Sequence, residues 1–475
     1  MIIWSFDDLV IKKYIVKWAH HQIIKLVFPI FGRVNPLAMK KIAFIFSILS
    51  FSQSSSFGQT WMGLNGGMNG IVYSVDTFNG NLYASGGFTL AGGNPVNNIA
   101  EWNGASWSAL GSGLNGGASV FCLYNGNLIA GGNFTIAGGT PANNIAAWNG
   151  TSWSAIGTGA NYEILALAVY NGNLYAGGLF DSAGGKPASH IAMWNGTSWF
   201  SLGSGTNGDV FALAVYHNKL YVGGGFALAG GNPANNLACW DGVTWTIPGR
   251  TYPYGVEALY VYNGLLYVGG AFDSINNVHA NNVACWNDTA WSALGTGINI
   301  ILDGVYSMAG DGNGLYVGGS FSMAGGNPVN NIAKWNGTTW SALGSGLNYG
   351  VQINGLCVYN GNVYAGGPFD SAGGQPENYI AEWGSPEGIN ELSPSNNLVT
   401  VYPNPSNGIF TIEQSAEKQS GVIEVYNVLG EKVFKSSFSA PRFTLDLSGQ
   451  PAGIYLYRLI TQEGKLISTG KLIKE

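Results

Sequence analysis

Tryptophan recurs at a nearly constant interval through most of this chain, and this period restricts the fold more than any other feature. One series steps by 46 residues five times and then by 49, and a second steps by 46 four times and then by 49 and 48. A fixed period of this size indicates a repeat architecture. The first series is Trp61, Trp107, Trp153, Trp199, Trp245, Trp291 and Trp340, and the second is Trp102, Trp148, Trp194, Trp240, Trp286, Trp335 and Trp383.

Each repeat predicts four short β-strands. In residues 107–152, four runs of apolar and aromatic residues are bounded by Gly, Asn or Pro, which is typical of strands separated by turns. Asn-Gly dipeptides at 125–126 and 149–150 suit the positive φ angles of two-residue hairpin turns, whereas the other two joints are longer. The expected strands are Trp107–Leu110, Val120–Tyr124, Leu128–Gly131 and Ile145–Trp148.

Seven such meanders predict an all-β, seven-bladed β-propeller over residues 59–383. A small antiparallel sheet cannot bury both of its faces alone, and radial stacking of repeated sheets solves this problem. The array begins in the phase of a fourth strand and ends at Trp383 in the phase of a third. We therefore expect Trp61–Leu64 to supply the outer strand of the last blade and to close the ring.

Two further series of equivalent residues are the expected core between the blades. Their presence in nearly every repeat indicates packing rather than chemistry. They are Phe88, Phe134, Phe180, Phe226, Phe272, Phe321 and Phe369, and Tyr83, Tyr175, Tyr221, Tyr267, Tyr316 and Tyr364, with Ile129 in the second repeat.

The repeat resembles those of kelch and galactose-oxidase-like propellers, and most closely a Gly-rich repeat of secreted bacterial proteins. The strand–Gly-Gly pattern followed by paired aromatic residues carries this resemblance, which covers residues 61–383. It implies the fold and says little about activity, because one fold hosts many functions.

The first 58 residues predict export rather than part of the fold. A basic start at Met39-Lys40-Lys41, ten apolar residues and a small-residue site at Ser56 and Gly58 are typical of a signal peptide over residues 39–58. Its apolar stretch is too short for a transmembrane helix. Residues 1–38 are then an upstream extension, with an amphipathic anchor as the alternative.

The composition changes after the last repeat. Residues 384–397 are a linker, and seven alternating strands between Val399 and Ile473 predict a small β-sandwich over residues 398–475. This segment resembles the type A C-terminal sorting domain of type IX (Por) secretion substrates in Bacteroidetes. The matching residues include Tyr402, Pro403, Asn404, Pro405, Gly408, Gly430, Gly453, Tyr455, Lys471 and Lys474.

The sorting-domain resemblance implies partners and a location. The partners are the type IX secretion machinery and its sorting peptidase. The location is the extracellular medium or the outer-membrane surface, with the domain removed from a mature protein that is either released or anchored.

Charge and cysteine content exclude some classes of function. Residues 61–383 contain four basic and fourteen acidic residues, a formal charge of −10, so few phosphates can be neutralised and nucleic-acid binding is excluded. Cys239 and Cys285 are repeat equivalents, as are Cys122 and Cys357; equivalent positions lie too far apart for disulfides, and we expect four buried free thiols. No metal-ligand or cofactor motif is present, although calcium binding needs no motif.

Departures from the repeat indicate where a ligand could bind. The longer joints of every blade open on one face, and loops on a rigid scaffold are where function concentrates. We expect the unusual residues on this face to surround the mouth of the central channel, in an arrangement suited to stacking a sugar or gripping a peptide, with simple drift of exposed loops as the alternative. They are Tyr162, Glu163, Asp209, Arg250, Tyr252, Tyr254, Asp303 and Tyr349.

Three hypotheses of function follow. The first is a secreted or surface-displayed protein that binds a glycan or a protein and acts in adhesion. The second is an extracellular polysaccharide hydrolase or lyase, for which Glu163, Asp209 and Asp303 are the available carboxylates. The third is a structural protein of a surface layer, with no ligand.

Overall fold

The computed structural model of the chain describes residues 59–348, 352–384, 399–414, 420–427, 431–440, 442–461 and 466–475. These residues form strands, turns and bends, with no helix among them. The predicted extension 1–38, the signal peptide 39–58 and nearly all of the linker 384–397 lie outside the described residues. The chain divides into two compact units between Gly384 and Ser385, and each is described by itself.

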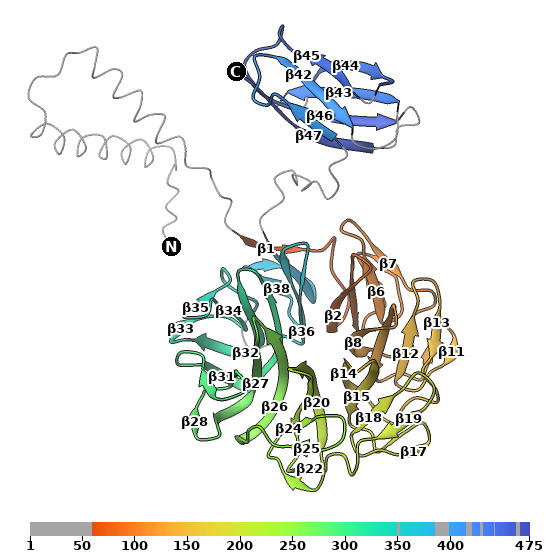
Figure 1. The fold of residues 1–475 in the computed structure, drawn as a ribbon, viewed down its shortest axis with the longest axis vertical. Helices are drawn as coiled ribbons and strands as arrows, with labels where there is room; N and C mark the ends of the chain where they lie inside the picture. Colours follow the sequence, from red (N-terminus) through yellow and green to blue (C-terminus); the bar gives the residue numbers. More distant parts are fainter. Residues whose placement is uncertain are drawn as a thin grey trace, which may run out of the picture. The chain divides into compact units, whose positions relative to one another are not determined.

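The first unit consists of seven antiparallel sheets around a common centre, named here the first to seventh sheet in order of their innermost strands (Figure 1). Each innermost strand contacts the innermost strands of the two neighbouring sheets, and the seventh contacts the first, so the ring is closed. These strands are β2 (Val72–Phe78), β8 (Ala118–Tyr124), β14 (Ile164–Tyr170), β20 (Asp209–Tyr216), β26 (Thr251–Tyr262), β31 (Ile298–Asp311) and β36 (Gly355–Tyr359).

The remaining main strands follow outward in the same order in every sheet. The second strands are β3 (Asn81–Gly86), β9 (Asn127–Gly132), β15 (Asn173–Gly178), β21 (Lys219–Gly225), β27 (Leu265–Ile275), β32 (Gly314–Ala324) and β37 (Asn362–Gly366). The third strands are β6 (Ile99–Trp102), β12 (Ile145–Trp148), β18 (Ile191–Trp194), β24 (Leu237–Trp240), β29 (Val283–Trp286), β34 (Ile332–Trp335) and β40 (Ile380–Gly384). The outer strands are β7 (Trp107–Ala109), β13 (Trp153–Ala155), β19 (Trp199–Ser201), β25 (Trp245–Thr246), β30 (Trp291–Ala293), β35 (Trp340–Ala342) and β1 (Thr60–Gly63).

The prediction of an all-β chain of four-stranded meanders arranged like a propeller is confirmed, and one of the two turn predictions is wrong. Asn125 and Gly126 have φ angles of 48° and 76° and form the expected two-residue turn between β8 and β9. The next Asn-Gly begins a four-residue turn instead. There the Oδ1 atom of Asn149 accepts hydrogen bonds from the backbone N–H groups of Thr151 and Ser152 at 2.9 and 2.8 Å.

The longer joint between the second and third strands contains an additional pairing that the sequence analysis did not predict. Two-residue strands pair across the Gly-Gly turn, or, in the fifth and sixth sheets, pair with an extension of the second strand. These short strands are β4 (Leu90–Ala91), β5 (Asn94–Pro95), β10 (Ile136–Ala137), β11 (Thr140–Pro141), β16 (Ser182–Ala183), β17 (Lys186–Pro187), β22 (Leu228–Ala229), β23 (Asn232–Pro233), β28 (Val278–His279), β33 (Asn327–Pro328), β38 (Ser371–Ala372) and β39 (Gln375–Pro376).

The seventh sheet is completed by the beginning of the unit, as the phase of the tryptophan series predicts. Strand β1 pairs with β40 in an antiparallel register that places Trp61 opposite Trp383. The two indole rings are 5.5 Å apart, similar to the paired rings of Trp102 and Trp107 at 5.2 Å.

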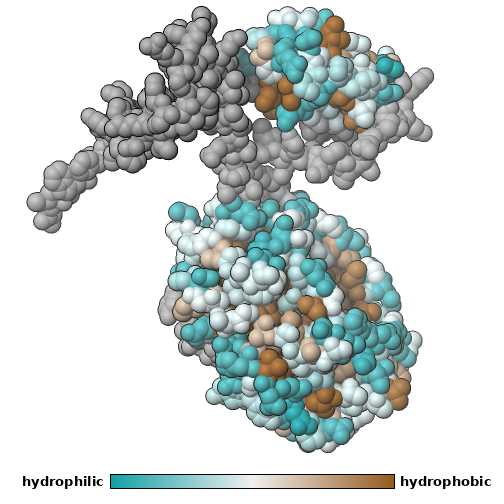
Figure 2. All heavy atoms as spheres, turned by 60° about the vertical axis from the view of Figure 1, so that its left-hand side comes forward, coloured by the Kyte–Doolittle hydropathy of each residue, from teal (hydrophilic) through white to brown (hydrophobic). Residues whose placement is uncertain are grey.

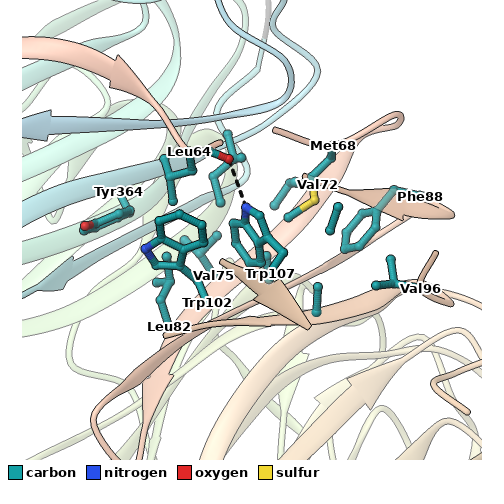
Figure 3. Packing of buried hydrophobic residues seen from close by; sticks show 14 of the residues in the cluster. Leu64, Met68, Val72, Val75, Leu82, Phe88, Val96, Trp102, Trp107 and Tyr364 are labelled. Carbon is teal, nitrogen blue, oxygen red and sulfur yellow. Dashed lines mark hydrogen bonds between the residues drawn. The ribbon is translucent and has the colours of Figure 1, made fainter. Parts of the chain in front are cut away.

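Each outer tryptophan also joins its sheet to the preceding one. The Nε1–H of Trp107 donates a 3.0 Å hydrogen bond to the backbone carbonyl of Leu64, which follows the outer strand β1 of the seventh sheet (Figure 3). Trp61 makes the same bond to the carbonyl of Leu343 at 2.8 Å and so includes the closing strand in the pattern. The other bonds are Trp153 to Leu110, Trp199 to Ile156, Trp245 to Leu202, Trp291 to Pro248 and Trp340 to Leu294, all between 2.8 and 3.1 Å.

Glycine on the second strand allows neighbouring sheets to approach closely. A Cβ atom added at Gly177 would lie 2.3 Å from the Cγ1 atom of Val210 on the next sheet. The first sheet has Ser85 at the equivalent position, and there the facing residue is Ala118. The Oγ atom of Ser85 accepts a 2.8 Å hydrogen bond from the Ala118 N–H, so a larger residue on one sheet is matched by a smaller one on the next.

The second unit contains two antiparallel sheets that share one core. The first has the order β41 (Val399–Tyr402), β42 (Ile409–Gln414) and β45 (Arg442–Asp446). The second has the order β44 (Lys432–Phe438), β43 (Gly421–Asn427), β46 (Gly453–Thr461) and β47 (Leu466–Lys474). Buried residues from both sheets, among them Phe410, Ile412, Val425 and Leu459, form a single cluster, in agreement with the predicted sandwich.

We predict that Gly177→Ser destabilises the first unit by about 1–3 kcal/mol, because the new side chain collides with Val210 in a packed interface. Adding Val210→Ala should restore most of this loss, since that pair reproduces Ser85 and Ala118. Thermal unfolding followed by circular dichroism measures both. Val210→Ala alone is the control, and strictly additive effects of the two changes would contradict the proposed complementarity.

Candidate functional site

The innermost strands enclose a cavity of about 200 Å³ at the centre of the ring. Its lining comes from all seven sheets, at positions that are equivalent in the repeat. One ring of positions near the start of these strands carries Ser119, Leu165, Phe211, Glu257, Tyr306 and Asn354, and a second ring, two residues further along, carries Val75, Leu167, Leu213, Leu259, Met308 and Leu356. The cavity is therefore apolar within and mixed in character at the end where the long joints open.

The first of these rings contains most of the polar groups of the cavity, and Ser74 and Ser307 line it between the two rings. Glu257 is its only charged residue, and no Lys, Arg or His lines the cavity among the described residues. The Nδ2 atom of Asn354 donates a 2.9 Å hydrogen bond to the carbonyl of Val72, which ties the seventh sheet to the first. Glu257, Phe211 and Tyr306 are partly exposed on three consecutive sheets, the fourth to the sixth.

Three of the predicted site residues are tyrosines exposed on the face of the long joints. Tyr162 and Tyr254 occupy equivalent positions just before β14 and within β26, with 59% and 67% exposure. The first, second and fourth sheets have Gly there. Tyr252, 52% exposed, lies two residues before Tyr254. The third and fifth repeats therefore present aromatic rings to solvent at this position, where the sixth carries Asp303 and the seventh Val351.

Glu163 and Asp209 also occupy equivalent positions, but they contact different partners. The Oγ atom of Ser119 in the cavity lining donates a 2.8 Å hydrogen bond to Oε1 of Glu163, which places this carboxylate at the channel mouth. Oδ1 of Asp209 lies 3.5 Å from Nδ1 of His190. His190 stands where Asn144 and Asn282 bridge to a carbonyl of the next sheet, but its buried Nδ1 atom makes no hydrogen bond.

The remaining predicted residues are less closely connected to the channel. The guanidinium of Arg250 donates a 3.1 Å hydrogen bond to the carbonyl of Pro233, in the short hairpin β22–β23, and so lies against the hairpin. Asp303 falls within β31, but its side chain lies outside the described part of the chain, as does the whole of Tyr349. Phe211, Glu257 and Tyr306 were not predicted. Aligning the positions that face the channel, at intervals of 46, would have exposed them.

Another carboxylate lies on an innermost strand but outside the cavity lining. Asp76 is on β2, and burial raises its pKa to about 6, although its Oδ1 accepts a hydrogen bond from the Thr77 N–H. Its repeat equivalents on other sheets include Cys122, Tyr260 and Cys357. The negative charge of Asp76 further raises the pKa values of the Cys122 and Cys357 thiols, which burial already raises.

The cysteines are free, as predicted, but only two of the four are fully buried. Cys239 and Cys357 are buried, whereas Cys122 and Cys285, at the equivalent positions of other repeats, are partly exposed. Among the described residues, no group of three or more His, Cys, Asp or Glu side chains could hold a metal ion.

In the second unit, the residues of the sorting motif converge on the last strand. The Nδ2 atom of Asn404 donates to the carbonyl of Lys471, and its Oδ1 accepts from the N–H of Ile473, both at 2.8 Å. The side-chain amide thus hydrogen-bonds to the edge strand β47 as a neighbouring strand would. It covers backbone groups that would otherwise be open to pairing with another chain. The Nζ atom of Lys474 donates to the carbonyls of Ser448 and Gln450.

The other motif residues fix turns and strand ends around the same region. A Cβ atom at Gly408, whose φ is 115°, would lie 2.8 Å from the Cα of Ser448. The hydroxyl of Tyr402 donates to a carboxylate oxygen of Glu413 at 2.6 Å, and that of Tyr455 donates to the carbonyl of Pro451 at 2.6 Å. Pro403 and Pro405 follow cis peptide bonds. Gly430 lies outside the described residues, and Gly453 begins β46.

A buried carboxylate holds the larger sheet of this unit together. The side chain of Glu424 is 4% exposed and accepts from Nζ of Lys432 at 2.6 Å, from the Tyr426 hydroxyl at 2.7 Å and from Arg458 at 2.7 Å. The hydrogen bond from Lys432 is the largest of several contacts that hold the pKa of Glu424 well below its usual range. A buried charge needs such partners, so this network is part of the fold.

Residues 400–475 match the family described as the secretion system C-terminal sorting domain. The predicted sorting domain is thereby confirmed, and the chain is exported through the type IX secretion machinery to the cell surface or the extracellular space. No curated protein sequence matches the chain. No helix among the described residues has the length and apolar character needed to cross a membrane.

Several solved structures align with most of the chain at low identity. PorZ of Porphyromonas gingivalis, an essential bacterial surface component of the type-IX secretion system, aligns at 13% identity over 85% of this chain and 65% of its own, with a TM-score of 0.39. The extracellular domain of BT4673 from B. thetaiotaomicron aligns at 13% over 88% and 59%, with a TM-score of 0.45. A fungal alcohol oxidase of the AA5 family, in complex with copper, aligns at 10% over 88% and 100%, with a TM-score of 0.34. The chain spans less than two thirds of the first two proteins, and these scores carry no argument about activity.

Asp76→Asn should stabilise the first unit at neutral pH by up to about 2–3 kcal/mol, since a pKa raised by about two units marks an ionised carboxylate that the fold disfavours. Below pH 6 the folded protein takes up the proton before the unfolded chain does, so the advantage of the variant should shrink toward pH 4. Denaturant unfolding across this range measures it.

Asp241→Asn is the control for this prediction. Asp241 accepts turn hydrogen bonds that lower its pKa, and the equivalent turns carry Asn, so its replacement should not stabilise the protein at neutral pH. A gain in stability for Asp76→Asn that does not change with pH would contradict the raised pKa of Asp76 as its cause.

Asn404→Asp should destabilise the second unit by about 1–2 kcal/mol, because the carboxylate keeps the acceptor for Ile473 but loses the donor to Lys471. Hydrogen exchange of the β47 amides in the full chain reports the opening of this edge. Asn427→Asp, which makes the same change on the inner strand β43, is the control. Unchanged protection of β47 in Asn404→Asp would refute the role of the amide.

Proposed function

We propose that the first unit is a binding module, displayed at the cell surface or released, whose face with the long joints binds a glycan or a surface protein. The observation that carries this proposal is the exposure of Tyr162, Tyr252 and Tyr254 on one face of a closed, rigid ring. Aromatic side chains that offer large, rigid area at low entropic cost are typical anchors of recognition surfaces.

The surface character of the unit supports binding rather than membrane insertion. On the side drawn in Figure 2, apolar residues of this unit form separate small patches among polar ones. The formal charge of −10 over residues 61–383 favours ligands that are neutral or basic. Adhesion is the role that we infer for a binding module carried by an exported protein.

We also propose that the repeats are of the kelch-like and galactose-oxidase-like kind, in a Bacteroidetes protein. The series of tryptophan, phenylalanine and tyrosine residues supports this assignment, as do the Gly pairs on the second strands. In this proposal the sorting peptidase removes residues after the linker, so the mature protein ends between the two units. The mass of the exported protein tests this step.

The alternative, a polysaccharide hydrolase or lyase, requires two convergent carboxylates at the mouth of the channel. The carboxylate of Glu163 accepts a hydrogen bond from Ser119 and that of Asp209 lies beside His190, so each contacts a different residue. We therefore rank binding above catalysis, and a purely structural surface protein below both.

A glycan array and a pull-down from cell-surface extracts, both with the purified full chain, test the binding role. Replacing Tyr162, Tyr252 and Tyr254 together by Ala should weaken binding at least tenfold, about 1.4 kcal/mol. Phe200→Ala, which removes another exposed aromatic ring from an outer strand, is the control. Cleavage of a bound glycan, detected by mass spectrometry, would favour the enzyme instead. Absence of any ligand would favour the structural role.

A further inference from the structure

The central cavity differs from the tyrosine-bearing face in its chemistry. Its inner ring of Leu, Val and Met side chains forms an apolar floor, and Phe211, Glu257 and Tyr306 line the end at which the long joints open. These three residues come from β20, β26 and β31, which are consecutive innermost strands. An aromatic residue thus lies on the strand at each side of the glutamate.

The charge of the channel favours a cation over an anion. Glu257 is the only charged residue in the lining, and Glu163 joins the mouth through its hydrogen bond to Ser119. The four basic residues of the repeats, Lys186, Lys219, Arg250 and Lys334, are absent from the lining.

The kind of cation follows from the other lining residues. A metal ion such as Ca²⁺ takes six to eight oxygen ligands, whereas the walls below Glu257 are formed by residues such as Leu213, Leu259 and Met308. Aromatic faces attract ammonium and guanidinium groups, and the attraction increases when the group is withdrawn from water. An apolar floor suits the alkyl part of such a group.

We propose that this cavity binds an organic cation, with an alkylammonium or guanidinium group against Glu257 and between Phe211 and Tyr306. Two ligands carry this chemistry: the Lys or Arg side chain of a protein partner, and the amino group of an amino sugar. The proposal deepens the binding role of the same face. The volume of about 200 Å³ is enough for one side chain or one sugar ring.

Titration calorimetry of the full chain with three small probes tests the proposal. Nα-acetyl-lysine methylamide and glucosamine represent the two sources, and N-acetylglucosamine is the neutral counterpart of the second. We expect at least one cationic probe to bind and the neutral probe to bind at least tenfold more weakly. Preference for the lysine derivative would identify a protein ligand, and preference for glucosamine an amino sugar.

Glu257→Gln should weaken binding of the cationic probe at least tenfold, while the melting temperature stays within a few degrees of that of the unmodified protein. Glu101→Gln is the matched control, because it removes the same charge from β6, outside the cavity, and keeps the oxygen that accepts from Asn81. Tyr306→Leu, which retains an apolar side chain, should also weaken binding and provides a second test if Glu257→Gln fails to fold.

Three results would overturn the proposal: binding of neither cationic probe, equal binding of the neutral and cationic probes, or binding that Glu257→Gln leaves unchanged. The glycan array and the pull-down measure ligand binding by the tyrosine variants and do not depend on the cavity. Loss of glycan or protein binding in those variants therefore remains measurable if the cavity binds no cation. The two proposals can therefore fail separately.

Discussion

The bond between each outer-strand indole and the preceding sheet is the interaction on which the first unit depends. An isolated four-stranded meander leaves both faces exposed, and the carbonyl that follows its outer strand would lack a partner. The indole of Trp107 supplies that partner to Leu64 while its ring fills the interface, and the same arrangement recurs around the ring. Burial of an unpaired carbonyl is costly, so each bond sets the relative position of two neighbouring sheets in addition to the packing between them. Each sheet needs one such tryptophan, and this produces the tryptophan period of the sequence.

Features repeated in every sheet were predictable from the sequence, since seven copies average out local variation. The innermost, second, third and outer strands appear at the expected places, and the equivalent phenylalanines, such as Phe180 and Phe321, are buried. The two-residue strands were missed because a pairing that short has no periodicity to detect. The four-residue turn at Asn149 was missed because Asn-Gly serves two kinds of turn, and the side-chain acceptor decides between them.

The candidate site was less predictable, because it depends on which side chains from different sheets meet in the channel. Tyr162 and Glu163 stood out as departures from the repeat, but the hydrogen bond from Ser119 to Glu163 joins residues 44 positions apart on separate sheets. Phe211 and Glu257 occupy ordinary strand positions, where an alternating pattern predicts only burial or exposure. The sorting motif shows the opposite case. Its residues were recognisable in the sequence, and the structure supplies the reason, since Asn404 bonds the backbone of the final strand.

The pairing of β1 with β40 gives the ring an unusual folding requirement. Residues near 60 hydrogen-bond to residues near 383, so the interface that closes the circle has the longest sequence separation in the unit. Such non-local pairing forms slowly, and until it forms, an unpaired strand edge stays open at each end of the array. A chain still emerging from a ribosome or a translocation channel cannot complete the circle until the last repeat is free. The moment of closure is therefore set by when the last repeat becomes available.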